Sequence, residues 1–97
     1  MSANPWDNLA REDALRTVST GFGSSEEAFW QSGERTAEFI EGHVAPLLHA
    51  RAVAVDFGCG IGRIALPMAH RFGVVRAVDV SGVMRDRLGR EAERRGI

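Results

Sequence analysis

The chain has 97 residues, of which 44% are hydrophobic and 26% are charged, and its formal net charge is −1. This composition is ordinary for one small globular domain, and the near-zero charge argues against a molecule-wide surface for nucleic acid or membranes. The single cysteine excludes an internal disulfide, so we expect a reducing, cytoplasmic location. We expect neither a secretory signal nor a membrane span, because basic and apolar leader features and a run of ~20 apolar residues are lacking.

The first half of the chain predicts helices. Asn4 can cap a first helix that has Pro5 at its first position. A loop rich in serine and glycine is expected at 19–25, followed by a short helix. A longer helix is expected at 34–44, where apolar residues recur at helical spacing. Pro46 should break it, because the residue before a proline avoids helical geometry.

The second half predicts two strands, each followed by a helix. The apolar run at 52–57 suits a parallel strand that is buried on both faces. A helix is expected at 63–72, a second strand at 74–80 and a last helix at 82–95, capped by Ser81. The alternating order predicts an α/β fold with a parallel sheet and flanking helices. Two strands are few for such a sheet, so we expect the fold to be incomplete.

A turn rich in glycine joins the first strand to the helix behind it. Its residues run Val-Asp-Phe-Gly-Cys-Gly-Ile-Gly-Arg, from Val55 to Arg63. Strand, glycine turn and helix in this order form the nucleotide pocket of doubly wound α/β proteins. One interpretation is a dinucleotide fingerprint at Gly60, Gly62 and Ala65. The other is an acid followed by alternating glycines, namely Asp56, Gly58, Gly60 and Gly62.

Two acidic residues bear on the choice between these interpretations. Asp56 ends the first strand, where its carboxylate would repel a diphosphate but suit a ligand that carries an ammonium or sulfonium group. Asp79 lies near the end of the second strand, where a carboxylate can accept hydrogen bonds from ribose hydroxyls. Asp79 therefore supports a nucleoside with either cofactor, whereas Asp56 favours the ligand without phosphate.

The glycine turn, taken with the later Ala-Val-Asp-Val-Ser-Gly-Val-Met, resembles the class I S-adenosyl-L-methionine-dependent methyltransferases. The resemblance implies a Rossmann-like parallel sheet and S-adenosylmethionine as the cofactor. It implies that the turn wraps the methionine and ribose portions, that Asp79 contacts the ribose, and that Val80 and Met84 line the adenine side. The cofactor-binding residues implied in this way are Asp56, Phe57, Gly58, Cys59, Gly60, Gly62, Asp79, Val80 and Met84.

The same resemblance organises the chain into two parts. Residues 1–50 are expected to form a helical segment that caps the cofactor site, with 29–34 similar to a segment that closes over the cofactor in some members. Residues 51–97 are expected to be the first strand-helix-strand-helix part of the cofactor-binding domain, with the remainder missing. The implied activity is a transferase reaction on an unidentified acceptor, expected to be a small molecule, and no catalytic residue is assigned.

Two alternatives stay open. A nicotinamide- or flavin-dependent oxidoreductase would use the dinucleotide fingerprint. A non-catalytic fragment that serves as an interaction module is the third hypothesis. We expect no metal site, because His43, His49 and His70 lack ligand spacing. Cys59 is expected to be a small buried residue rather than a nucleophile. No nucleic-acid or membrane partner is expected, and the oligomeric state is left open.

Overall fold

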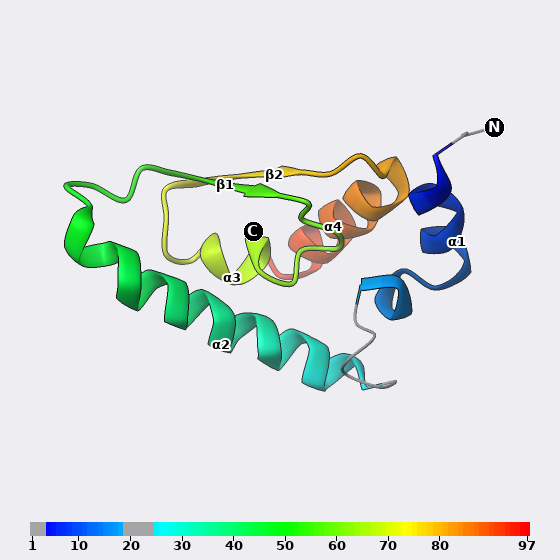
Figure 1. The fold of residues 1–97 in the computed structure, drawn as a ribbon, viewed down its shortest axis with the longest axis horizontal. Helices are drawn as coiled ribbons and strands as arrows, with labels where there is room; N and C mark the ends of the chain where they lie inside the picture. Colours follow the sequence, from blue (N-terminus) through cyan, green and yellow to red (C-terminus); the bar gives the residue numbers. More distant parts are fainter. Residues whose placement is uncertain (1–3, 19–24) are drawn as a thin grey trace.

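The computed structural model describes residues 4–18 and 25–97, so most of the predicted loop at 19–25 lies outside the described residues (Figure 1). Two parallel strands and several helices follow one another along the chain and form an α/β structure. The elements are α1 (Pro5–Val18), α2 (Glu26–Val44), the 3-10 turn η1 (Ala45–Leu47), β1 (Val53–Phe57), α3 (Ala65–Met68), β2 (Val74–Val78) and α4 (Gly82–Arg94).

The sheet consists of β1 and β2 in parallel, with Val53 opposite Val74 and Phe57 opposite Val78. Strands paired in this register end together, so the residues that follow Phe57 and Val78 meet at one edge of the sheet. Both predicted strands are present, although β2 ends two residues earlier than expected. This common end positions the glycine turn beside Asp79.

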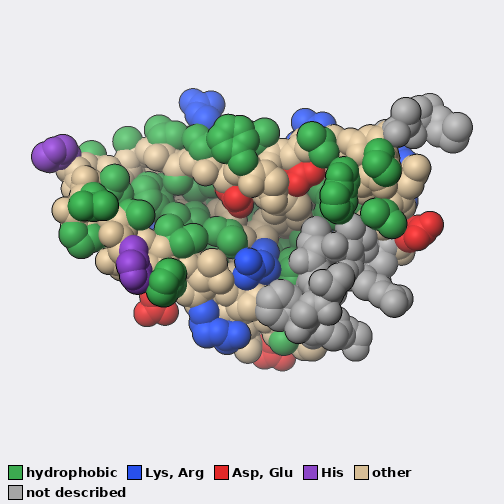
Figure 2. All heavy atoms as spheres, in the orientation of Figure 1, with side chains coloured by type: hydrophobic (Ala, Val, Ile, Leu, Met, Phe, Trp, Pro, Cys, Tyr) green, Lys and Arg blue, Asp and Glu red, His purple; other side chains and the backbone are tan. Residues whose placement is uncertain are grey.

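The prediction that the first strand is buried on both faces is wrong. Exposure alternates along both strands, because α2, α3 and α4 lie on one side of the sheet only, while α1 lies beyond its carboxyl end (Figure 1). Hydrophobic side chains therefore remain at the surface along the sheet (Figure 2). The exposed residues of this outer face include Val53, Val55, Phe57, Val74 and Val78.

Helix α2 is continuous, whereas two separate helices were expected over this part of the chain. It begins where expected, because the Ser25 hydroxyl accepts a hydrogen bond from the amide of Ala28 at 3.1 Å. It passes through Gly33, which is buried against the backbone of Arg63. The end of α2 near Pro46 is confirmed, since the chain changes there to a 3-10 turn. The expectation that Ala45 avoids helical geometry is wrong, because its φ is −52° and its ψ is −42°.

Helix α3 is shorter than the predicted helix at 63–72. It begins two residues later than expected, because residues 61–64 form a turn. After Met68 the chain tightens into turns, in which the Ala69 amide is shared between the carbonyls of Ala65 and Leu66. These turns lead into β2, so only the four residues of α3 are regular helix, and all four are buried.

The predicted caps of the first and last helices are confirmed. The Asn4 side-chain oxygen accepts a hydrogen bond from the Trp6 amide at 2.9 Å. The Ser81 hydroxyl accepts one from the Met84 amide at 3.1 Å, and α4 ends one residue earlier than expected, at Arg94. Among the described helices, none combines the length and apolar character that a membrane crossing requires.

The core lies beneath the carboxyl end of the sheet. A buried cluster joins Ala10 of α1, Phe29 of α2, Ile61 of the glycine turn and Met84 of α4. Phe29 is completely inaccessible to solvent and meets Trp30 edge to face, with ring centroids 4.9 Å apart. The helices at 1–50 and the elements at 51–97 thus share one core, and this core supports the glycine turn from below.

Candidate functional site

The turn between β1 and α3 has a backbone that glycine accommodates best. Gly58, Gly60 and Gly62 have φ angles of 75°, 55° and 99°, in the left-handed region that disfavours residues with a Cβ. A Cβ on Gly62 would also lie 2.9 Å from atoms of Leu66 and Leu88. Gly62 therefore packs the turn onto the helices, whereas Gly58 has open space beside it.

Four amides of this turn already have acceptors within the chain. Gly58 and Cys59 both donate to the carbonyl of Val78, at 2.7 Å and 3.0 Å. Gly60 donates to Oδ2 of Asp79 at 2.9 Å. The amide of Gly62 donates to the carbonyl of Cys59 at 3.0 Å. Hydrogen bonds thus fix the turn to the end of β2, and these four amides are not available to bind an anion.

Asp79 connects the two halves of the site. Its Oδ1 accepts a hydrogen bond from the Ser81 amide at 2.9 Å, while Oδ2 holds Gly60. A carboxylate oxygen has two lone pairs, so each oxygen can accept one further hydrogen bond. Asp79 is therefore fixed in orientation and can still accept two donors from a ligand.

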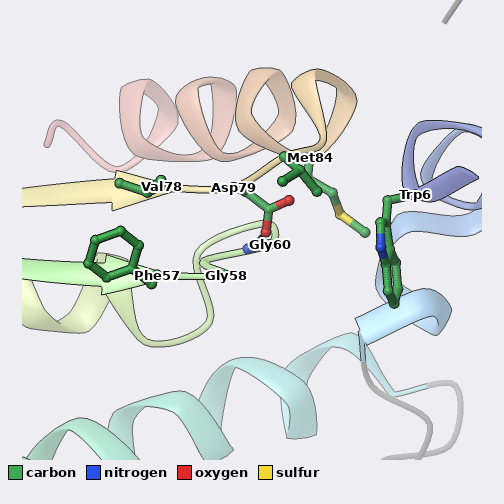
Figure 3. Close-up of a pocket in the computed structure, with 8 residues that line it drawn as sticks. Trp6, Phe57, Gly58, Gly60, Val78, Asp79 and Met84 are labelled. Atoms are coloured by element: carbon green, nitrogen blue, oxygen red, sulfur yellow. Dashed lines mark hydrogen bonds between the residues drawn. The ribbon is translucent and has the colours of Figure 1, made fainter. Parts of the chain in front are cut away.

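A cavity of about 390 Å³ opens beside Asp79. Figure 3 shows the Asp79 carboxylate between Gly60 and Met84, with the Phe57 ring at one end of the cavity and the Trp6 indole at the other. Most of the wall is apolar, which suits a planar ring bounded by one polar anchor. The lining residues are Trp6, Phe57, Gly58, Gly60, Val78, Asp79, Val80 and Met84.

A second cavity, of about 200 Å³, lies on the other side of the glycine turn. Gly58 and Gly60 line both cavities, so the two spaces adjoin across the turn. The second cavity contains one acidic and one basic side chain, Asp56 and Arg63. Its remaining lining residues are Phe29, Cys59, Ile61 and Ile64.

The charged side chains of the second cavity are held by their surroundings. Burial raises the pKa of the Asp56 carboxyl, with Arg63 opposing the rise and the negative charge of Asp79 adding to it. Arg63 reaches across to α2, where its Nη1 donates to the hydroxyls of Ser32 and Thr36, both at 3.3 Å. The cavity therefore presents an anion and a cation in fixed relation.

Cys59 is a buried thiol, as the sequence predicts, with 6% of its surface exposed. Burial raises its pKa to about 11, and the negative charges of Asp79 and Asp56 contribute to the rise. A thiol with this pKa is protonated at neutral pH and is a poor nucleophile. Its place in the second cavity is that of a small apolar wall residue.

The structure brings together most of the residues that the sequence proposes for the site. All of them except Gly62 line one of the two cavities, and Gly62 packs beneath the turn instead. The site residues proposed from the sequence omitted Trp6 and Val78 of the first cavity and four residues of the second, namely Phe29, Ile61, Arg63 and Ile64. Arg63 directly follows the last glycine of the turn, so its position was a usable signal, whereas Trp6 comes from α1 with no local motif around it.

Within the described part of the chain, no group of three or more His, Cys, Asp or Glu side chains is placed to hold a metal ion. Comparison of the chain with protein-family models, with curated proteins and with solved structures gave no match.

Proposed function

We propose that this chain binds S-adenosylmethionine in a Rossmann-like domain and serves a methyltransferase that acts on a small-molecule acceptor. One observation carries the proposal. The glycine turn has carboxylates in the cavities on its two sides, Asp56 in one and Asp79 in the other, and the amides of Gly58, Cys59, Gly60 and Gly62 are bonded within the chain. Such a turn favours a nucleoside that carries positive charge and no phosphate.

The charge of the site argues against the dinucleotide alternative. A diphosphate is normally held by free backbone amides at the start of a helix. Here the Gly60 amide is occupied by Asp79, and the helix behind the turn is only four residues long. A diphosphate at the turn would face two carboxylates in a partly dry pocket, where like-charge repulsion is costly. A sulfonium and an ammonium group would be attracted by the same carboxylates.

The two adjoining cavities match the two ends of the proposed cofactor. Asp79 can accept hydrogen bonds from two ribose hydroxyls, and the apolar walls of its cavity suit the adenine. In the second cavity, Asp56 suits the ammonium and Arg63 suits the carboxylate of the amino-acid end. Opposite charges in one small cavity are the expected complement of a zwitterion.

When bound, S-adenosylmethionine supplies a methyl group that its sulfonium already activates. The contribution of this chain is to hold and orient the cofactor. Correct positioning of the reactants can by itself account for a large part of the rate enhancement of methyl transfer. Asp79 anchors the nucleoside, and Asp56 with Arg63 anchors the amino-acid end. The Cys59 thiol is protonated and takes no part in the transfer.

Calorimetric titration with S-adenosylhomocysteine and, separately, with NADH tests the proposal. We expect saturable binding of S-adenosylhomocysteine and none of NADH. Asp79→Ala should weaken the binding by roughly 1–3 kcal/mol, the usual cost of leaving buried polar partners unpaired. Asp86→Ala, on the exposed part of α4, is the matched control and should bind as the wild type does.

Two results would contradict the proposal. Saturable binding of NADH without S-adenosylhomocysteine would favour the oxidoreductase. Absence of binding by either ligand to the folded chain would favour the interaction module. An unchanged affinity of Asp79→Ala would remove Asp79 from the site while leaving the class of ligand intact.

A further inference from the structure

Helix α1 is anchored beside the nucleoside cavity by polar contacts that reach across the sequence. Oδ1 of Asp7 accepts hydrogen bonds from the Ser81 hydroxyl at 2.5 Å and from the Val83 amide at 3.2 Å. Asp7 is 8% exposed, so these bonds are protected from water. The Asn4 side chain also donates to the carbonyl of Val80 at 2.8 Å. The first turn of α1 is thereby fixed to the junction of β2 and α4, next to Asp79.

Trp6 lies within this anchored turn, yet its side chain is not buried in the core. It is 52% exposed and lines the cavity that contains Asp79. Figure 3 shows the indole at the end of the cavity opposite Phe57, with the Met84 side chain extending toward it. A large aromatic ring left half exposed while its neighbour Asp7 is buried is a surface available to a ligand.

We propose that Trp6 is the stacking platform for the nucleobase and that Asp7 is the positioning residue that holds it. The inference rests on the proposed binding of a nucleoside cofactor and adds the contact that recognises its base. Asp79 anchors the ribose within the same cavity, so a base attached to that ribose lies between Asp79 and the indole wall. The apolar side chains of Met84 and Val80 line this space. Stacking on an aromatic ring binds a base without hydrogen bonds to its edges, which suits a cavity with so few polar groups.

Titration of the 97-residue chain with S-adenosylhomocysteine, adenosine and NADH tests the platform, with calorimetry and tryptophan fluorescence as the two readouts. The chain has two tryptophans, Trp6 and Trp30. Binding of S-adenosylhomocysteine should quench the tryptophan fluorescence of the wild type. The Trp6→Phe variant should lose this quenching but bind the ligand only modestly less tightly. Trp6→Leu should bind S-adenosylhomocysteine roughly tenfold to a hundredfold more weakly, the loss expected for one stacked base.

The positioning role of Asp7 has its own variants. Asp7→Ala should reduce both the affinity and the quench, because Trp6 loses its fixed place while the indole itself is retained. Asn8→Ala, on the exposed side of the same helical turn, is the matched control and should leave both unchanged. Circular dichroism and the thermal midpoint of each variant show whether the fold persists. The Trp6→Phe comparison keeps the test decisive if Trp6→Leu unfolds.

The outcomes separate this inference from the proposed function. Wild-type affinity of the folded Trp6→Leu variant for S-adenosylhomocysteine would overturn the platform and leave the cofactor assignment standing. Binding of NADH in place of S-adenosylhomocysteine, weakened by Trp6→Leu, would uphold the platform and overturn the cofactor assignment. Failure of the folded wild-type chain to bind any of the three ligands would overturn both.

Discussion

Asp56 illustrates a conflict between stability and binding at a single residue. Its carboxyl is partly buried, and that burial raises its pKa because the charged form loses hydration. Arg63 offsets part of this penalty, and Asp79 increases it. A cationic ligand would stabilise the charged form, so the cost borne by the free protein is recovered on binding. Functional sites commonly carry such locally unfavourable charges.

Asp56→Asn should therefore raise the thermal midpoint of the free chain at pH 7. The folded state has the higher pKa, so between the ordinary value of 3.8 and the raised value it binds more protons than the unfolded state. Wild-type stability consequently falls as the pH rises through this window, and the asparagine removes that loss. Thermal unfolding followed by circular dichroism at a series of pH values should show the gain shrinking toward pH 3.8.

Asp86→Asn, at an exposed position of α4, is the control for removing one negative charge and should show no such trend. The Asp56→Asn chain should also bind S-adenosylhomocysteine more weakly than the wild type, although it is the more stable protein. A lower thermal midpoint of Asp56→Asn at neutral pH would mean that the attraction of Arg63 outweighs the cost of burying the Asp56 carboxylate. Asp56 would then stabilise the free protein instead of destabilising it.

The acids and glycines of the site could be predicted from the sequence because they lie within two short segments that end adjacent strands. Asp56 and Asp79 are brought together by the parallel register, which follows from the order of strands and helices. Trp6 could not be predicted in this way. Its place depends on contacts of Asn4 and Asp7 with residues 74 to 76 positions away, and no local pattern reports them.

At the scale of elements, the α-helices and strands of the described chain could be predicted, but not all of their lengths, and the 3-10 turn η1 was not predicted. The sequence predicts two helices where the structure has the single helix α2. A glycine such as Gly33 weakens a helix in isolation, which is consistent with a predicted boundary next to it. In the folded chain, the absence of a side chain at Gly33 lets α2 contact the backbone of Arg63. For α3 the reverse holds, since turns at 61–64 and after Met68 shorten a segment that was expected to be helical throughout.

Gly33→Ala and Gly42→Ala should change stability in opposite directions. A Cβ at Gly33 would lie 1.9 Å from the carbonyl oxygen of Arg63, so α2 must shift at a cost of about 1–3 kcal/mol. Gly42 has nothing within 4 Å of such an atom, and alanine there should add roughly 0.4–1 kcal/mol. Urea unfolding gives both values. Equal gains at the two positions would show that helix propensity alone governs α2.

At the scale of the whole molecule, the core is built on one side of the sheet. The buried cluster of Phe29, Ile61 and Met84 lies toward the helices, while the outer face carries exposed valines and Phe57, which is 80% exposed. The sequence alone suggested burial on both faces, because an apolar run without polar alternation is typical of covered parallel strands. Helices α2, α3 and α4 lie on one side of the sheet and α1 lies beyond its carboxyl end, and no strand pattern could reveal this arrangement (Figure 1).

Substituting threonine for valine on each face measures this asymmetry in solution. Val55 is 50% exposed on the outer face, whereas Val75 is partly buried on the inner face of the neighbouring strand. Val55→Thr should change the free energy of unfolding by less than about 0.5 kcal/mol, as is usual at exposed positions. Val75→Thr should cost at least about 1 kcal/mol, because it places a hydroxyl against the apolar side of the sheet. Both variants make the same change within a strand, so the difference in strand propensity between valine and threonine is similar in the two chains. Urea unfolding at several protein concentrations provides the comparison, and a loss at Val55 as large as that at Val75 would mean that the outer face is covered in solution.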